Sequence, residues 1–488
     1  MLSTKNKNLV VAIVCGIFFC FALVFYGSQP LLSDVSYFVA ADQRILQGAV
    51  PYVDIFENNP PLAFWFTLPA VWLARLLNQN AETVFVVFVL LLNAAILSFI
   101  WKLHRQDSRG NHYRQYLILI LTVVFSFCLA FGFGQREYFA TLLLLPYICS
   151  VALRCNRQVL PQGFKIPLGL LAGIGVCFKP YFILIPALVE IFLAVQCKNW
   201  RLLFRTEVLV AVGVVVLYPV IVWWFYPTYF IEILPLTLLT YSAYQASYAA
   251  IIMSSTFLIF VGAAILTLTA SFWTAARDRG ILVWMAAALA GVVIHFVQHM
   301  GWPYHLLPGL AFITIALLLC AMQMQIPVLK MGICFIVLLC IGAGLTDYRQ
   351  TQDKSFTRFD TLLNGVQPRR MMMLTYDLGS AFPFMPAHNI EWVGHYQSLW
   401  PMAAIEKHKL SDSEGQPVLK KMALTIALDI LEQKPDFLIV DHRPFSDRSE
   451  KGDHSPIVQL SSIVEFKSAW SYYRQLNDDG AFQLWQRQ

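Results

Sequence analysis

The sequence predicts a polytopic α-helical membrane protein with about 11 transmembrane helices and a C-terminal soluble α/β domain. Of its 488 residues, 58% are hydrophobic and only 13% are charged, and the mean hydropathy is +0.60. Apolar runs of roughly 17 to 22 residues recur over positions 1–346, and each can cross about 30 Å of hydrocarbon as a helix. Charged residues return after position 347, where no run is long enough to span a bilayer. This composition excludes an ordinary soluble enzyme.

The positions of Lys and Arg predict the orientation of these runs, because short cytoplasmic loops collect positive charge. Lys5 and Lys7 precede the first run, so the N-terminus is predicted to be cytoplasmic, and no cleavage site follows that run. Basic residues then fall in alternate connections, and an odd number of crossings leaves the C-terminus outside. The predicted spans are 9–27, 82–101, 115–132, 137–153, 167–178, 181–197, 206–226, 251–273, 281–298, 305–322 and 328–346.

The composition divides the chain into two predicted domains. Residues 1–346 form the transmembrane domain, with a first outer loop over 28–80, and residues 347–488 form a periplasmic α/β domain. At about 140 residues the second domain is large enough to bury a core of its own. Within it we expect strands at Met371–Tyr376, Pro435–Val440 and Ala481–Trp485, and a helix at Lys420–Glu432.

Cysteine usage is informative because all ten cysteines lie before position 347. The outer domain therefore has no disulfide framework, and no CxxC pair indicates a metal site. This pattern fits the inner membrane of a Gram-negative bacterium.

Chemistry is expected at the outer face, because ionisable side chains beside membrane spans are costly and usually have a partner or a role. Asp34 opens the first outer loop, which also holds Asp42, Asp54 and Glu57. The other candidates lie at the outer ends of later spans. They are Gln135-Arg136-Glu137, Lys179 and the turn His299-Met-Gly-Trp-Pro-Tyr304-His305.

The acids of the first loop also have structural interpretations. Asp34 could cap a helix that begins near Tyr37. Glu57, which precedes Pro60 and Pro61, could be an ordinary loop acid. Neither residue is a strong signal when it is taken singly.

The later candidates have structural interpretations too. Arg136 and Glu137 could pair with each other, and Lys179 could extend to the membrane interface. An aromatic belt could account for His299, Trp302, Tyr304 and His305. The convergence of four loops on one face nevertheless favours a site over scattered charges.

The order of these motifs resembles that of the GT-C glycosyltransferases. Asp34 is followed by Gly48-Ala-Val-Pro-Tyr52 and then by Glu57-Asn-Asn-Pro-Pro-Leu-Ala-Phe-Trp65. This arrangement is similar to the first outer loop in the branch that holds protein O-mannosyltransferases and the lipid A aminoarabinose transferase. Gln135-Arg136-Glu137, Phe178-Lys179-Pro180 and the Trp-Pro-Tyr-His turn follow in the order that this branch has them. The resemblance covers the stretch 1–346.

The resemblance implies an inverting transfer of a sugar from a polyprenyl-phosphate donor at the outer face of the membrane. The acceptor would be a component of the cell envelope: a lipopolysaccharide, another glycan or a protein. Asp34 would be the general base. The expected partners are therefore the lipid-linked donor, the envelope acceptor and the bilayer, with no nucleic acid.

The same resemblance assigns roles to the remaining candidates. Arg136 and Lys179 would take up the charge of the departing phosphate. Glu137 falls where the family has its second acid. Substrate contacts are implied for Glu57, Arg136, Glu137, Lys179, Tyr304 and His305.

Two departures from the family pattern bear on donor and metal binding. Asn59 stands where the aminoarabinose branch has a Lys before Pro-Pro-Leu, so one phosphate contact is lost there. The acid pair that often begins the motif is reduced to Asp34-Val35. No obligatory metal is therefore predicted, although a divalent metal is compatible with the motifs.

Two other classes of protein are alternatives. A transporter or flippase of lipid-linked sugars would share the many spans, but it would tend to have ionisable residues within spans and repeated halves. The key charges here lie at span ends, and the chain has no clear internal repeat. A membrane-anchored envelope assembly factor would not need the acids of the first loop.

Overall fold

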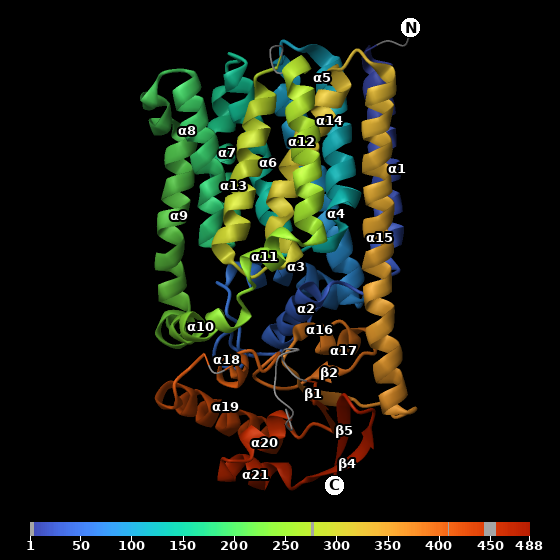
Figure 1. Ribbon diagram of the computed structural model, residues 1–488, viewed down its shortest axis with the longest axis vertical. Coiled ribbons are helices and arrows are strands. Elements are labelled where there is room, and N and C mark those ends of the chain that lie inside the picture. Colours follow the sequence, from blue (N-terminus) through green and yellow to red (C-terminus); the bar gives the residue numbers. More distant parts are fainter. Residues whose placement is uncertain (1–3, 275–277, 408, 444–454) are drawn as a thin grey trace. The chain divides into compact units, whose positions relative to one another are not determined.

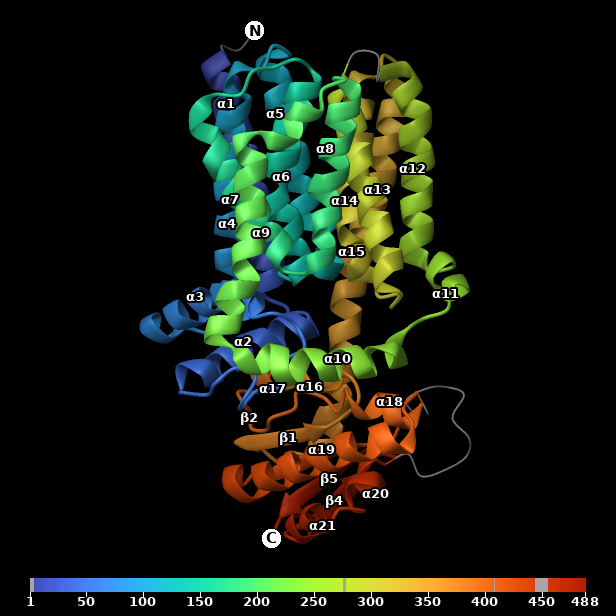
Figure 2. The same ribbon diagram turned by 90° about the vertical axis from the view of Figure 1, so that its left-hand side faces the viewer.

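The computed structural model describes residues 4–274, 278–407, 409–443 and 455–488, most of which are helical (Figures 1 and 2). The chain forms two compact units. Unit 1 comprises Met1–Ser28, Phe85–Ile221 and Ala246–Tyr348, and unit 2 comprises Gln29–Val84, Val222–Gln245 and Arg349–Gln488.

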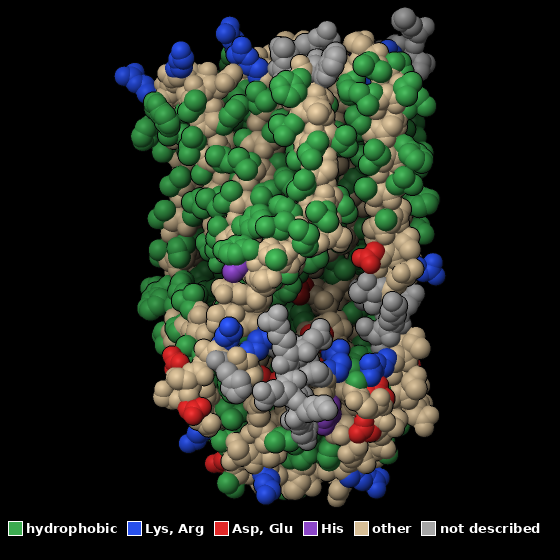
Figure 3. All heavy atoms as spheres, in the orientation of Figure 1, with side chains coloured by type: hydrophobic (Ala, Val, Ile, Leu, Met, Phe, Trp, Pro, Cys, Tyr) green, Lys and Arg blue, Asp and Glu red, His purple; other side chains and the backbone are tan. Residues whose placement is uncertain are grey.

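Unit 1 is a bundle of apolar helices. Helix α6 is buried along almost its whole length, whereas α1, α9, α12 and α15 turn apolar side chains outward. Figure 3 shows these side chains covering the visible flank of the bundle, with Lys and Arg at the end that carries the N-terminus. The helices wholly or partly in this unit are α1 (Thr4–Gly27), α4 (Ala81–Leu103), α5 (Gly110–Val123), α6 (Arg136–Cys155), α7 (Lys165–Cys177), α8 (Leu184–Gln196), α9 (Thr206–Phe225), α11 (Tyr248–Ile252), α12 (Ser255–Thr274), α13 (Gly280–Gln298), α14 (Leu307–Gln323) and α15 (Pro327–Leu363).

Eight helices of the described chain are long and apolar enough to cross a membrane. They correspond to eight of the predicted spans. The other three predicted spans stay predictions, because their helices are shorter. The run 115–132 is divided between α5 and a π-helical segment, Val124–Cys128, and the runs 167–178 and 181–197 form the short apolar helices Gln162–Cys177 and Pro180–Gln196.

Helices α13 and α14 pack closely, and this contact positions Gln298 and His305. A Cβ atom added to Gly291 would lie 2.3 Å from the backbone nitrogen of Gly309. Glycine at both positions therefore lets the two backbones touch, as small residues do between membrane helices. Between the helices the chain turns at His299, which has a φ of 56°, and Gly301, which has a φ of 69°.

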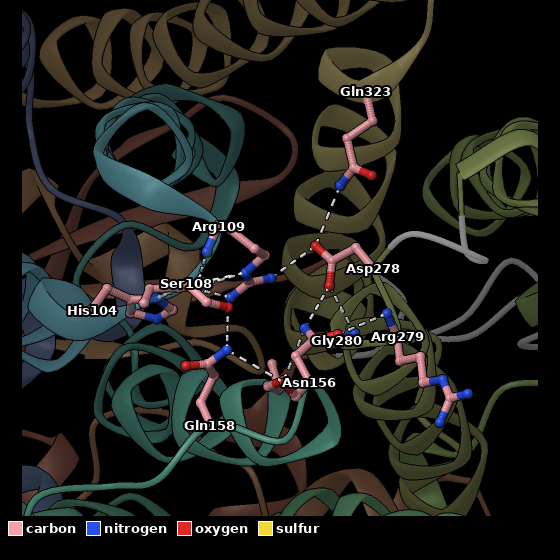
Figure 4. A network of polar contacts seen from close by, with 11 residues as sticks. His104, Ser108, Arg109, Asn156, Gln158, Asp278, Arg279, Gly280 and Gln323 are labelled. Carbon is pink, nitrogen blue, oxygen red and sulfur yellow. Dashed lines mark hydrogen bonds and ion pairs between the residues drawn. The ribbon is translucent and has the colours of Figure 1, made fainter.

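At the basic end of unit 1, a group of polar side chains links several helix ends. We call this group the Asp278 network (Figure 4). Asp278 Oδ2 accepts a hydrogen bond from Arg109 Nη1 at 2.8 Å, and Asp278 Oδ1 accepts one from Asn156 Nδ2 at 2.7 Å. Arg109 also donates to Asp107, which contacts His104 Nδ1 at 2.9 Å. The network thus connects the α4–α5 loop to the ends of α6 and α13. Its members are His104, Asp107, Arg109, Asn156, Asp278 and Gln323.

Unit 2 begins with two packed helices, α2 (Ser33–Leu46) and α3 (Leu62–Leu77). Pro60 and Pro61 immediately precede α3, which suits proline because the first turn of a helix needs no backbone donor there. Asn78 ends α3 in the left-handed conformation. Helix α10 (Leu234–Thr240) also belongs to this unit.

The rest of unit 2 is a mixed five-stranded sheet with helices, which agrees with the predicted α/β arrangement and adds two strands, β2 and β4, that were not predicted. Strands β2, β1 and β3 are parallel, and β5 and β4 are antiparallel, in the order β2-β1-β3-β5-β4. The three predicted strands and the predicted helix are confirmed; that helix lies within α19, which begins with a Ser411–Glu414 capping box. The elements are β1 (Arg370–Leu374), α16 (Leu378–Ala381), α17 (Phe384–Ala387), β2 (Glu391–Trp392), α18 (Met402–Glu406), α19 (Asp412–Gln433), β3 (Phe437–Asp441), α20 (Pro456–Leu460), α21 (Val464–Trp470), β4 (Tyr473–Asp478) and β5 (Phe482–Arg487).

Candidate active site

Three connections of unit 1 bring polar side chains together around Lys179. The Lys179 Nζ atom lies 2.6 Å from Glu137 Oε1, 3.3 Å from Gln298 Oε1 and 3.5 Å from His305 Nε2. The Tyr304 ring centroid is 5.8 Å from the same nitrogen. We call the group of Arg136, Glu137, Lys179, Gln298 and His305 the Lys179 cluster. Three of the four predicted loops thus meet within unit 1.

Local sequence explains how each side chain reaches the cluster. Glu137 lies in the first turn of α6, which begins directly after the extended N-cap residue Gln135. Lys179 is the extended residue before Pro180, whose ring starts a short 3₁₀ helix. His305 lies in the 3₁₀ turn Pro303–Leu306, ahead of α14. All three side chains therefore sit at helix starts, where the chain changes direction.

Burial argues against two of the structural interpretations. Lys179 is only 7% exposed and is paired with Glu137, so it does not extend into solvent at an interface. His305 is 0% exposed, so it is not a surface residue of an aromatic belt. Arg136, at 8% exposure, adds a second buried cation next to the ion pair. The region therefore holds two buried cations and a buried carboxylate close together.

Several buried atoms of this region have no hydrogen-bond partner within the part of the chain that the structure describes. They include the donor Gln298 Nε2, the acceptor Glu137 Oε2 and the ring nitrogen His305 Nδ1. Buried polar atoms are normally paired, because leaving one unpaired costs roughly 1–3 kcal/mol. A group of unpaired donors and acceptors around an ion pair can bind a ligand that carries both kinds of polar atom.

Two residues of this region were missed by the sequence analysis. Gln298 is the last residue of α13, and His295 lies one turn earlier with 1% exposure. Neither ring nitrogen of His295 has a partner among the described residues. The available signal was a histidine inside an apolar span, which is costly in lipid unless it has a role.

Asp34 and Glu57, the predicted residues of the first loop, belong to unit 2. Asp34 lies inside the first turn of α2, whose N-cap is Leu32 with no side-chain capping bond. Asp34 is therefore not the cap that one interpretation suggested. Glu57 is 2% exposed, and its Oε1 atom accepts a hydrogen bond from the Asn59 backbone nitrogen at 2.7 Å. Glu57 is thus a buried acid held in its turn, rather than an ordinary exposed one.

The other acids of the loop have structural partners. Asp42 is completely buried and accepts a hydrogen bond from Thr67, and burial raises the pKa of Asp42 well above its usual range. Asp54 is exposed, and its Oδ2 atom accepts from the Val50 backbone nitrogen at 2.7 Å. A carboxyl kept neutral by burial is unsuited to act as a base.

No group of three or more His, Cys, Asp or Glu side chains that could hold a metal ion occurs in the described part of the chain.

Comparison with known proteins relates the chain to solved structures. No protein-family model matches it, and no curated protein matches its sequence. The crystal structure of ArnT from Cupriavidus metallidurans bound to undecaprenyl phosphate matches with a TM-score of 0.60 at 12% identity, covering 99% of this chain and 98% of that one. The apo structure of the same ArnT matches with a TM-score of 0.55 at 14% identity, covering the same shares of both chains. The chain therefore has the fold of ArnT, a GT-C membrane glycosyltransferase.

Proposed function

We propose that this protein is an inverting GT-C glycosyltransferase that moves a sugar from a polyprenyl-phosphate donor to an acceptor of the cell envelope. The observation that carries this proposal is the Lys179 cluster, a buried group of two cations and a carboxylate with open donor and acceptor atoms on Gln298 and Glu137, in a bundle of apolar helices. The matched ArnT structure holds undecaprenyl phosphate, which is a ligand of the same chemical class as the proposed donor's lipid part.

The cluster suits the phosphate of such a donor. As the bond between the sugar and the phosphate breaks, negative charge grows on the phosphate oxygens and must be taken up by cations or N–H donors. Lys179 and Arg136 provide the charge, and Gln298 Nε2 is a buried donor without a partner among the described residues. Lys179 is held by Glu137 at 2.6 Å, so the ammonium is oriented before a ligand arrives.

The unpaired acceptors suit the sugar. A sugar hydroxyl donates one hydrogen bond and accepts others, and Glu137 Oε2 is a buried acceptor without a partner in the described chain. A carboxylate near the ring also stabilises the positive charge of an oxocarbenium-like transition state. The mixture of donors and acceptors therefore fits a sugar phosphate better than a bare anion.

Asp34 is the proposed general base, and it would take the proton from the acceptor hydroxyl as the new glycosidic bond forms. It is half-buried in the first turn of α2, where the helix dipole favours the ionised form. Attack by this hydroxyl from the side opposite the phosphate would invert the anomeric carbon.

The proposal is tested by mass spectrometry of envelope lipids, glycans and proteins from cells that carry the wild-type chain or Asp34→Asn. Both chains must be present in the membrane at matched levels. We expect a mass increment the size of one sugar to disappear in Asp34→Asn, and the increment itself identifies the sugar. Asp54→Asn, which changes an exposed acid of the same loop, is the matched control and should keep the increment.

The alternatives predict other results. If Asp34→Asn leaves the profile unchanged while deletion of the gene alters it, Asp34 is not the base, and a transporter or an assembly factor becomes the better explanation. Accumulation of the donor on one leaflet after deletion, with no loss of a transfer product, would indicate a flippase.

A further inference from the structure

Unit 2 contains an open groove of about 550 Å³ that none of the predicted site residues lines. This volume falls within the range of roughly 300 to 1,000 Å³ that is typical of small-molecule sites. The walls come from α2, α3, the first residues of α4 and the segment between α17 and β2. The lining side chains are Val39, Gln43, Leu46, Gln47, Val71, Ala74, Arg75, Gln79, Asn80, Ala81, Glu82, Pro386, Asn389, Ile390 and Glu391.

The charged side chains of the groove are already engaged. Arg75 Nη1 donates to the Leu46 carbonyl oxygen at 2.7 Å. Glu82 Oε1 accepts from the Ser36 hydroxyl at 2.5 Å. Glu391 lies 3.5 Å from the Arg370 guanidinium. A charged ligand would have to displace one of these partners.

The amide side chains of the groove are different. Gln43, Gln47, Gln79 and Asn389 are exposed, and within the described residues their side chains make no hydrogen bond. Each amide offers both donors and an acceptor, as a hydroxyl group does. Four such groups around one groove match a neutral ligand with many hydroxyls.

The groove also exposes some apolar surface. Leu46 and Pro386 are half-buried, whereas Val39, Val71 and Ala74 are buried behind the lining. A pyranose ring has C–H groups on its faces and hydroxyls at its edge. It can therefore place a face against an apolar side chain such as Leu46 while its hydroxyls reach the amides.

The groove lies on a different side of α2 from Asp34. Residues on a helix are separated by about 100°, so Asp34 is turned roughly 140° from Val39, which lines the groove. Ser36, two residues after Asp34, nevertheless bonds the groove residue Glu82. The groove is thus distinct from the proposed base but connected to the same helix.

We propose that this groove binds a neutral oligosaccharide, and that this oligosaccharide is the part of the acceptor that lies away from the reacting hydroxyl. The second statement rests on the proposed transferase function, and the first does not. The acceptor class that follows is a glycan, either free or attached to a lipid, rather than a bare protein side chain. A donor sugar has the same chemistry, so the experiment must separate the two sources.

The test measures binding of neutral trisaccharides to the full-length protein in lipid nanodiscs by saturation-transfer NMR. The probes are maltotriose, mannotriose and triacetylchitotriose, and trigalacturonate is the charged comparison. We expect at least one neutral probe to bind saturably and trigalacturonate to bind more weakly. The double variant Gln43→Leu/Gln47→Leu should weaken binding by about tenfold or more, because it removes two amides.

A variant outside the groove and a measurement of folding serve as controls. Gln416→Leu changes an exposed glutamine of α19 outside the groove and should bind like the wild type. Thermal unfolding of both variants shows whether they fold. A second groove variant, Gln79→Leu, alters the rim from the α3–α4 turn and should also weaken binding.

Three results would overturn the proposal. They are no saturable binding of any neutral probe, equal binding by the folded groove variants, and stronger binding of trigalacturonate. Displacement of the trisaccharide by undecaprenyl-phosphate sugars, but not by undecaprenyl phosphate, would assign the groove to the donor and overturn the acceptor assignment. Binding is measured without transfer, so loss of the transferase function alone would leave the binding result standing.

Discussion

Asp278, in the Asp278 network, and Glu137, in the Lys179 cluster, are both buried acids of unit 1, but they differ in how completely their carboxylate oxygens are paired. Each oxygen of Asp278 accepts two hydrogen bonds, and the donors come from four different residues. In the Lys179 cluster, Glu137 Oε2 and Gln298 Nε2 have no partner within the described chain. A fully paired carboxylate is what a structural connection requires, whereas a carboxylate with an open oxygen is what a ligand site requires before its ligand arrives.

The largest effect is expected from Asp278→Ala. The substitution leaves the half-buried Arg109, Asn156 and Gln323 without their shared acceptor, so the free energy of unfolding should fall by about 3 to 5 kcal/mol. Unfolding of the purified protein in mixed micelles measures this loss. Glu432→Ala removes an exposed acid and should change little. A stable Asp278→Ala protein that has lost sugar transfer would mean that Asp278 acts in the reaction rather than in stability.

The second prediction exchanges a whole ion pair for neutral groups. In Glu137→Gln/Lys179→Met no charge is left unpaired, so the protein should still fold, while sugar transfer falls by about 10²- to 10³-fold. The matched control is Arg154→Met/Glu207→Gln, which removes another buried pair of unit 1, with an N–O separation of 2.5 Å. Equal loss of transfer in both double variants would mean that the Lys179 cluster has no special part in the reaction.

Substitutions of two buried histidines, His295 and His104, are expected to change stability in opposite directions and by smaller amounts. His295→Phe removes two unpaired ring nitrogens from a buried position, so stability should rise by about 1 kcal/mol while transfer falls. His104→Phe removes the 2.9 Å contact with Asp107, so stability should fall by about 1 to 2 kcal/mol while transfer per folded molecule is kept. Parallel unfolding and transfer assays check both. A loss of stability in His295→Phe would mean that the His295 ring has a structural role.

The smallest expected effect is on the pH dependence of stability, and it concerns Asp429 and His395 of unit 2. The His395 backbone nitrogen donates to Asp429 Oδ2 at 2.7 Å. Burial raises the pKa of Asp429 to about 6, which is above its ordinary value of 3.8. Burial, helped by Arg44, lowers the pKa of the His395 ring to about 4, from 6.5.

The two shifts have opposite signs for stability. The folded state favours protonated Asp429, so that contribution is present at low pH and is lost as the pH rises through about 6. It also favours neutral His395, so that contribution is present at high pH and is lost as the pH falls through about 4. Each is worth roughly 1 to 3 kcal/mol, and the two oppose each other between these values.

Unfolding at several pH values between the two pKa values separates these contributions. The wild type should change little across this window. Asp429→Asn should lose stability as the pH falls, and His395→Gln should lose stability as the pH rises. Parallel curves for all three proteins would show that neither group titrates as the structure indicates.

Local patterns were sufficient for much of the fold. Apolar runs such as those of α1 and α13 cannot be soluble segments, and in lipid a helix is the structure that pairs every backbone group. The continuous apolar runs of strands β1 and β3 and the capping box of α19 are equally local signals. Where the pattern was interrupted, as at Val124–Cys128, length alone did not decide whether a run crosses the membrane.

The candidate site was only partly predictable. Arg136, Glu137, Lys179 and His305 were identifiable because charged and polar residues at span ends are costly and therefore few. That Glu137 pairs with Lys179 was not identifiable, because it depends on how α6 meets the turn before Pro180. Gln298 had no signal of its own, since a glutamine at a helix end is ordinary.

The amino-acid sequence by itself determined the membrane-spanning class, the residues able to do chemistry and the presence of an α/β unit, because hydrophobicity and backbone pairing act over short stretches. Only the tertiary structure decided which of the buried carboxylates are fully paired and which keep an open oxygen. That difference separates Asp278 from Glu137, and it depends on distances between helices far apart in the chain. The close contact of Gly291 with Gly309 is one such distance, since it brings Gln298 and His305 to the same ammonium group.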